Sequence, residues 1–347
     1  MAYSTIVKPE DYFNTKTYTG NGGTQTISGI GFQPDFTWVK GRDHAYYHYL
    51  QDAVRGSSNV LYTNNNDAEA TGVTAGISAW NSDGYVTGSQ GALNYNGRTF
   101  VAWNWKANGA GSANTDGNIN STVSANTTSG FSIVSYTGNG TAGATIGHGL
   151  GTAPKVVIVK RRSASGEWIM GHGSLGFTKF LELNLTGGAQ TSTLRFNDTA
   201  PTNQVFTVGS TADTNQNGTT IIAYCFAEKQ GFSKFGSYTG NGQADGTFVY
   251  TGFKPAFVMI KATSGTENWQ MYDNKRLGYN VDNNMLRTNL PDAEQTDDDI
   301  DILSNGFKLR RNSGAFNTSG STYIFMAFAE EPLVANSGTN GVPATAR

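Results

Sequence analysis

Residues 99–107 read TFVAWNWKA, and the pattern returns as TIIAYCFAE at residues 220–228 and as TYIFMAFAE at residues 322–330. Side chains alternate between the two faces of a strand, so every second residue of each run shares a face. One face is apolar in every copy, and it carries Val101, Trp103 and Trp105, then Ile222, Tyr224 and Phe226, then Ile324, Met326 and Phe328. We expect these side chains in hydrophobic cores.

The opposite face of each run is also largely apolar. It carries Phe100, Ala102 and Asn104, then Ile221, Ala223 and Cys225, then Tyr323, Phe325 and Ala327. A strand that is apolar on both sides is typical of the middle of a sheet. We therefore expect loops or a neighbouring chain to cover this face. Cys225 is interpreted as an inert buried thiol.

Three further landmarks precede each run in the same order. The pentapeptide YTGNG begins at Tyr18, Tyr136 and Tyr238, and a proline follows at Pro34, Pro154 and Pro255. Six residues beyond each proline stands a lysine, at Lys40, Lys160 and Lys261. We expect each lysine at a strand end, with its stem over apolar surface. YTGNG is interpreted as a tight turn in which both glycines take positive φ, because no Lys-Ser/Thr follows it as in a phosphate loop.

The repeated landmarks predict three tandem units of about 95 residues, each long enough to bury its own core. The first unit, with an N-terminal arm, covers residues 1–107, the second 130–230 and the third 231–333. Residues 108–129 are almost all Gly, Ala, Ser, Asn and Thr, a composition that predicts a flexible linker and the main hinge. Residues 334–347 are predicted to form a mobile tail.

The predicted fold class is all-β, with one β-sandwich or jelly-roll-like domain per unit. Turn signals such as Asn96-Gly97, Asn217-Gly218 and Asn305-Gly306 punctuate short alternating segments. No long stretch shows a period of 3.6 residues with helix caps.

Composition excludes several classes of protein. The chain has 24 basic and 26 acidic residues, so charge supplies no general attraction to nucleic acid. No apolar run approaches the roughly 18 residues that cross a bilayer, and residues 1–12 show no secretory signal. One cysteine and four histidines leave little material for a metal centre. We expect no cofactor, no nucleic acid and no membrane insertion.

Two charged pairs stand at matching places in the first and third units. Asp52 and Arg55 are three residues apart, as are Asp273 and Arg276, and the second unit has His172 and Leu175 instead. A local ion pair is the preferred interpretation, and a polar ligand contact is the alternative.

Two other stretches are candidate binding sites. Tyr46, Tyr47, His48 and Tyr49 predict an aromatic surface, either an oligomer interface or a glycan contact, with packing inside the sandwich as the third reading. The cluster of Asp297, Asp298, Asp299 and Asp301 is read as a solvated loop, with calcium binding as the alternative. No nucleophile or metalloprotease motif is present, and the chain is predicted not to be an enzyme.

The opening MAYSTIVKPEDYFNTKTYTGNG, the segment GFQPDFTWVKGR at residues 31–42 and DAVRG at residues 52–56 resemble the repeated β-rich virion structural proteins of marine tailed bacteriophages. The likeness is strongest over the first unit, and the second and third units depart from it at the Asp-x-x-Arg-Gly step. The resemblance implies a virion component in a tail fibre, a tail appendage or a capsid decoration. It also implies other virion proteins as partners.

A virion protein assembled in the reducing host cytoplasm needs neither signal peptide nor disulfides. The apolar faces predict a homo-oligomer, and the resemblance favours a trimer. A role in adhesion predicts a host-surface glycan as a further partner. The alternatives of another class are a carbohydrate-binding module and a polysaccharide depolymerase.

Overall fold

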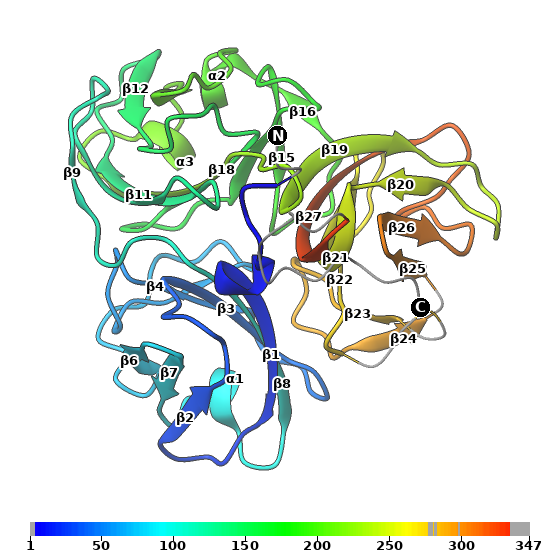
Figure 1. The fold of residues 1–347 in the computed structure, drawn as a ribbon. Helices are drawn as coiled ribbons and strands as arrows, with labels where there is room; N and C mark the ends of the chain where they lie inside the picture. The colour runs from blue at the N-terminus through cyan, green and yellow to red at the C-terminus, as the bar shows by residue number, and fades with distance from the viewer. Residues whose placement is uncertain (1–3, 277–279, 281–282, 298, 334–347) are drawn as a thin grey trace.

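The computed structural model describes residues 4–276, 280, 283–297 and 299–333. Figure 1 shows three lobes around a common centre, each built on a curved sheet whose strands run outward. Helices are limited to single turns in these residues: η1 (Pro9–Asp11), α1 (Gly91–Asn94), α2 (Thr193–Phe196) and α3 (Ala212–Asn215). None of them is long and apolar enough to cross a membrane.

Three antiparallel inner sheets face the centre. The first has the order β1 (Phe13–Thr19), β8 (Thr99–Trp105), β3 (Phe36–Gly41), β4 (Tyr49–Asp52), β5 (Leu61–Tyr62). The second has the order β16 (Gln190–Thr191), β15 (Lys179–Glu182), β14 (Ile169–His172), β13 (Val156–Arg161), β18 (Thr220–Phe226), β11 (Phe131–Thr137), β10 (Ser121–Asn126), β9 (Ser112–Asn114). The third has the order β19 (Ser233–Thr239), β27 (Thr322–Pro332), β21 (Phe253–Ala262), β22 (Gln270–Asp273).

Smaller outer sheets cover the inner ones. They are β2 (Gln25–Ser28), β7 (Gly84–Thr87) and β6 (Ile77–Asn81); β12 (Ala144–Gly147) and β17 (Val205–Val208); and β20 (Phe248–Tyr250), β26 (Gly306–Leu309) and β25 (Ile300–Leu303). The strands β23 (Asn283–Met285) and β24 (Gln295–Asp297) form a separate pair. Sheet packs on sheet, and the predicted all-β sandwich class is confirmed.

The three apolar runs at residues 99–107, 220–228 and 322–330 occupy the same place in their sheets. β8 lies between β1 and β3, β18 between β11 and β13, and β27 between β19 and β21. Their registers also correspond, because Trp103 is opposite Trp38 in β3, and Met326 is opposite Met259 in β21. Each run is therefore a central strand, as its two apolar faces predict.

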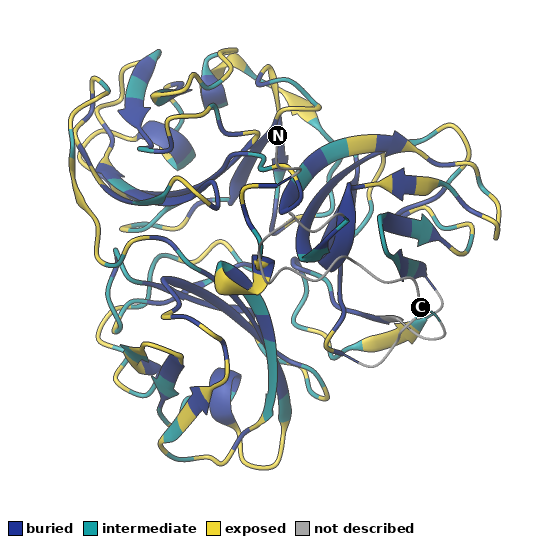
Figure 2. Cartoon of the chain, viewed as in Figure 1, coloured by how far each residue is buried: buried dark blue, intermediate teal, exposed yellow. Residues whose placement is uncertain are grey.

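The inner faces of the three sheets meet in one core, and this corrects the expectation of a separate core for that face in each unit. The ring of Trp105 lies 6.4 Å from the ring of Phe226, 6.0 Å from Phe257 and 5.5 Å from Phe328, so side chains of all three inner sheets touch there. All of them are buried, as Figure 2 shows along the central strands. Alternation predicts which side chains are buried, but it does not predict what covers them.

The second apolar face of each central strand is covered within its own lobe. Tyr323 and Phe325 are buried beneath the outer sheet, where the ring of Phe325 lies 5.5 Å from that of Phe307. Ile221 and Ala223 share a core with Phe206 of β17. These faces give no reason to expect a second chain, and a homotrimer stays a prediction.

Residues 108–129 are not a free spacer. β10 pairs along its whole length with β11, and β9 pairs with β10, so this segment extends the second inner sheet. Ile119 and Val123 are buried, and the Ile119 N–H donates to the carbonyl of Thr145 at 3.0 Å. Gly117 is required beside β12, because a Cβ at this position would lie 2.3 Å from the carbonyl oxygen of Thr145 in that strand. The segment is rich in small polar residues and still forms strands, because backbone hydrogen bonds hold it and Ile119 and Val123 anchor it.

We expect limited proteolysis of the native protein not to cut residues 112–114 and 121–126, because the backbone of these strands is hydrogen-bonded in a sheet. The protein is digested briefly with a broad-specificity protease, and the fragments are identified by mass spectrometry. If the first cut falls within residues 108–129 and releases the first unit, the segment is a flexible linker after all.

Candidate functional site

Asp52 and Arg55 form the local ion pair that their spacing predicts. Asp52 ends β4, its Oδ1 accepts from the backbone N–H of Arg55 at 2.9 Å, and its Oδ2 accepts from the guanidinium. Both side chains are fully buried. A buried charge pair is stable only where its remaining donors and acceptors are also satisfied.

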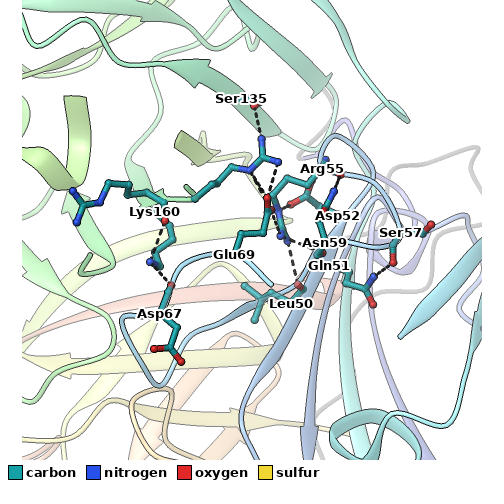
Figure 3. A network of polar contacts seen from close by, with 12 residues as sticks. Leu50, Gln51, Asp52, Arg55, Ser57, Asn59, Asp67, Glu69, Ser135 and Lys160 are labelled. Atoms are coloured by element: carbon teal, nitrogen blue, oxygen red, sulfur yellow. Dashed lines mark hydrogen bonds and ion pairs between the residues drawn. The ribbon is translucent and has the colours of Figure 1, made fainter. Parts of the chain in front are cut away.

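Those remaining groups are satisfied by Glu69 of the first unit and by Arg162 and Tyr224 of the second. Arg55 Nη1 donates to Glu69 at 2.9 Å, and Glu69 also accepts from Arg162 Nη2 at 2.8 Å. The Tyr224 hydroxyl donates to Asp52 at 2.8 Å. Figure 3 shows Asp52, Arg55 and Glu69 in line, with contacts on both sides. The pair is thus the centre of a junction between the first and second units, with no open side for a ligand.

The junction between the third and first units has the same construction. Arg276 Nε donates to Asp273 at 2.7 Å, and Arg276 Nη1 donates to Glu294 at 2.9 Å. Glu294 also accepts from Arg42 Nε and Nη2, each at 3.0 Å. Trp103 Nε1 donates to Asp273 at 2.9 Å, as the Tyr224 hydroxyl donates to Asp52 at the other junction. Asp273 and Arg276 are therefore structural, like Asp52 and Arg55.

At the junction between the second and third units, the residues that correspond to the Asp–Arg pair are neutral. His172 stands where the others have aspartate, and its Nδ1 accepts from the Ser174 N–H at 3.1 Å while its Nε2 faces the Phe325 carbonyl at 3.3 Å. Leu175 stands in place of the arginine and packs against the central core. Burial lowers the pKa of His172 from its ordinary 6.5 to about 4.

This shift predicts a loss of stability in acid. Between pH 6.5 and 4 the unfolded chain protonates His172 and the folded chain does not, so the free energy of unfolding falls as the pH falls. The difference amounts to about 3 kcal/mol by the bottom of that window. We expect His172→Asn to flatten the curve, measured as urea unfolding of both proteins from pH 7 to pH 4. Parallel curves for the two proteins would contradict the assignment.

A ring nitrogen crosses each junction eight residues after the repeated lysine. Trp168 Nε1 donates to the Tyr62 carbonyl at 2.9 Å, and Trp269 Nε1 donates to the Glu182 carbonyl at 3.0 Å. His48 is the equivalent residue in the first unit. Its Nδ1 accepts from Trp38 at 2.9 Å, so Nε2 carries the proton and donates to the Arg287 carbonyl at 2.8 Å.

The predicted aromatic surface at residues 46–49 is therefore wrong as a continuous patch. His48 and Tyr49 are fully buried, and Tyr46 is partly buried beside His44. Only Tyr47 of the four is exposed, at 47%, and its ring lies 5.3 Å from that of Tyr62. Tyr46 and Tyr49 pack in the core beneath the outer sheet of the first unit, whereas His48 faces the third unit.

The repeated lysines are also buried, which corrects the expectation of a stem lying on an apolar surface. Lys160 Nζ donates to the carbonyls of Asp67 at 2.8 Å and Gly166 at 2.9 Å, the first of them in the neighbouring unit. Lys261 Nζ donates to the Thr186 carbonyl at 3.0 Å across the next junction. Burial lowers the pKa of Lys40 to about 7 and the pKa values of Lys160 and Lys261 to about 8.

The acidic cluster is bound by arginines. Asp297 and Asp299 both contact Arg311, and Asp301 contacts Arg310 at 3.3 Å. Asp298 lies outside the described residues. Within the described part of the chain, no three His, Cys, Asp or Glu side chains gather where they could hold a metal ion.

A repeated buried asparagine was not expected from the sequence. Asn94 Oδ1 accepts from the Asn21 N–H of the YTGNG turn at 2.7 Å, and Asn215 and Asn317 make the same contact with Asn139 and Asn241. The signal was present as Asn-x-x-Gly shortly before each central strand.

The YTGNG turns differ from expectation at the first glycine. Only the second takes positive φ, at Gly22, Gly140 and Gly242. At Gly20 the need is space, since a Cβ would lie 2.4 Å from the Tyr95 carbonyl oxygen.

Comparison with known proteins gives a match to a family model but no match to a curated protein. A family model described as a domain of unknown function, DUF7483, matches residues 8–332. None of the curated proteins matches the sequence.

Proposed function

The chain belongs to the DUF7483 domain family, and we propose that it is a structural protein of a bacteriophage virion. In this proposal it forms part of a tail fibre or tail appendage, where it serves assembly and attachment to the host surface. It assembles in the host cytoplasm with other virion proteins.

The observation that carries the proposal is the use made of the buried polar residues. Asp52 and Asp273 accept from Tyr224 and Trp103 of a neighbouring unit, and Lys160 and Lys261 donate to carbonyls of a neighbouring unit. Arg55 and Arg276 reach the neighbouring unit through Glu69 and Glu294, which bind Arg162 and Arg42. Buried charges that are paired in this way stabilise a shape. A rigid body of this kind suits a particle part, and the resemblance of residues 1–22 to phage virion proteins gives the same reading.

The test is immunogold labelling of purified particles of a phage whose genome encodes the chain. Antibody raised against the chain is expected to label the tail. Particles that carry no label while the lysate contains the protein would refute a virion role.

A capsid decoration protein is the second candidate, and one observation favours it. Three lobes surround one shared core within a single chain, so a single copy could occupy a threefold position of a shell. Label over the head, with none on the tail, would select this candidate.

A further inference from the structure

Two aromatic rings stand exposed on β20, the edge strand of the third outer sheet. Phe248 is 44% exposed and Tyr250 is 52% exposed, while Val249 between them is buried. Alternation places both rings on the outward face, about 7 Å apart along the strand. Figure 2 shows β20 with exposed residues on either side of its buried one.

The fold does not require aromatic residues there. β2 is the corresponding strand of the first unit, with buried Ile27 in place of Val249, and it carries Thr26 and Ser28 on its outward face. β12 of the second unit carries Thr145 and Gly147 around buried Ile146. Because small or polar residues serve the other two units, the exposed rings call for another explanation.

The rings border a flat, partly polar surface. Across the sheet from Phe248 lie Lys308 and then Asp301, and across from Tyr250 lie Gly306 and then Leu303. Gly306 has no side chain, and a Cβ there would lie 3.1 Å from a ring carbon of Phe248. The Phe248 ring therefore lies against the backbone of Gly306.

Charged groups around the rings are paired with one another. Lys308 contacts Asp245, and Arg310 contacts Asp301 at 3.3 Å. Two cations and two carboxylates cancel, so the surface has hydrogen-bond donors and acceptors but no net charge. It suits a neutral ligand that has both apolar C–H faces and many hydroxyl groups.

We propose that this surface, the β20 platform of Phe248, Tyr250, Lys308 and Asp245, binds a neutral polysaccharide. Sugar rings lie on Phe248 and Tyr250, and their hydroxyls bond to the charged pairs beside them. The inference rests on the proposed adhesive role and names its ligand class. A protein partner fits less well, because two half-exposed rings fall far short of the roughly 800 Å² that each side of a stable interface buries.

The experiment uses affinity electrophoresis of the full chain in native gels that contain one polysaccharide each. Xyloglucan, glucomannan, galactomannan and dextran are the neutral probes, and alginate is the anionic one. The variant Phe248→Thr with Tyr250→Ser carries the residues of the first unit at these places. Tyr95→Ser is the matched control, because Tyr95 is 51% exposed and lies in the first unit.

We expect at least one neutral probe to retard the wild type and the control equally. The double variant should bind with a dissociation constant about tenfold higher or more, with an unchanged thermal unfolding midpoint. Retardation by no neutral probe, by alginate alone, or to the same degree in the double variant would each overturn the inference. So would concentration-dependent self-association that the double variant abolishes, because the rings would then form a protein interface.

The two proposals fail separately. Labelled particles without polysaccharide binding would remove the platform and leave the virion role. Binding by the platform with unlabelled particles would remove the virion role and leave a carbohydrate-binding module.

Discussion

Trp105→Ala is expected to lower the free energy of unfolding by about 3–5 kcal/mol, the usual range for a fully buried large ring. The ring is 3% exposed and lies 4.8 Å from Phe13 and 5.2 Å from Phe36 in its own sheet, besides its contacts with the other two sheets. It also lines a cavity of about 20 Å³ at the centre, which the truncation would enlarge. The measurement is urea unfolding followed by circular dichroism.

Two comparisons make this result specific. Trp105→Phe keeps most of the ring and removes an indole N–H that has no hydrogen-bond partner, so it should cost much less. Trp80→Ala, at a partly exposed position of β6, should also cost less. Equal losses for Trp105→Ala and Trp80→Ala would mean that the shared core does not dominate stability.

Arg55→Met is expected to cost about 3–5 kcal/mol, because it leaves the buried carboxylate of Asp52 without its counter-ion. Lys234→Met is the control, because the Lys234–Glu228 pair is exposed by 40% and 30% and should contribute at most about 1 kcal/mol. Both are measured as shifts of the urea midpoint.

The second unit suggests a double variant that should recover the lost stability. Asp52→His with Arg55→Leu reproduces the neutral pair His172 and Leu175, and we expect it to recover most of the stability that Arg55→Met loses. Replacing both partners removes the unpaired charge, whereas replacing one creates it. A double variant as unstable as Arg55→Met would show that the first junction depends on the charges themselves.

Local patterns predicted local features of this structure. Alternation over residues 99–107 identified buried Trp103 and Trp105, and the spacing of Asp52 and Arg55 identified their ion pair. The joining of three inner faces in one core was not predictable, because it relates segments more than a hundred residues apart. For the same reason the sequence pointed to Asp52 and Arg55 but not to Arg162, which binds Glu69 beside them.

The errors have physical causes as well. Residues 108–129 looked like a linker because composition counts side chains, whereas β10 is held mainly by backbone hydrogen bonds. Tyr46 to Tyr49 looked like a surface because consecutive aromatics must alternate. Here both faces of the segment are covered over most of its length, and Tyr47 alone is exposed.

The contact between Arg42 and Glu294 joins residues 252 positions apart, and it has a consequence for the order of folding. On the ribosome the first unit emerges long before the third, so the part of its Trp105 face that Phe257 and Phe328 cover stays exposed until the third unit is made. Contacts of such long range slow folding, and exposed apolar surface in the meantime favours aggregation. Chains truncated before the third unit should therefore need chaperones or collect in inclusion bodies, while the completed protein, once closed, should unfold slowly.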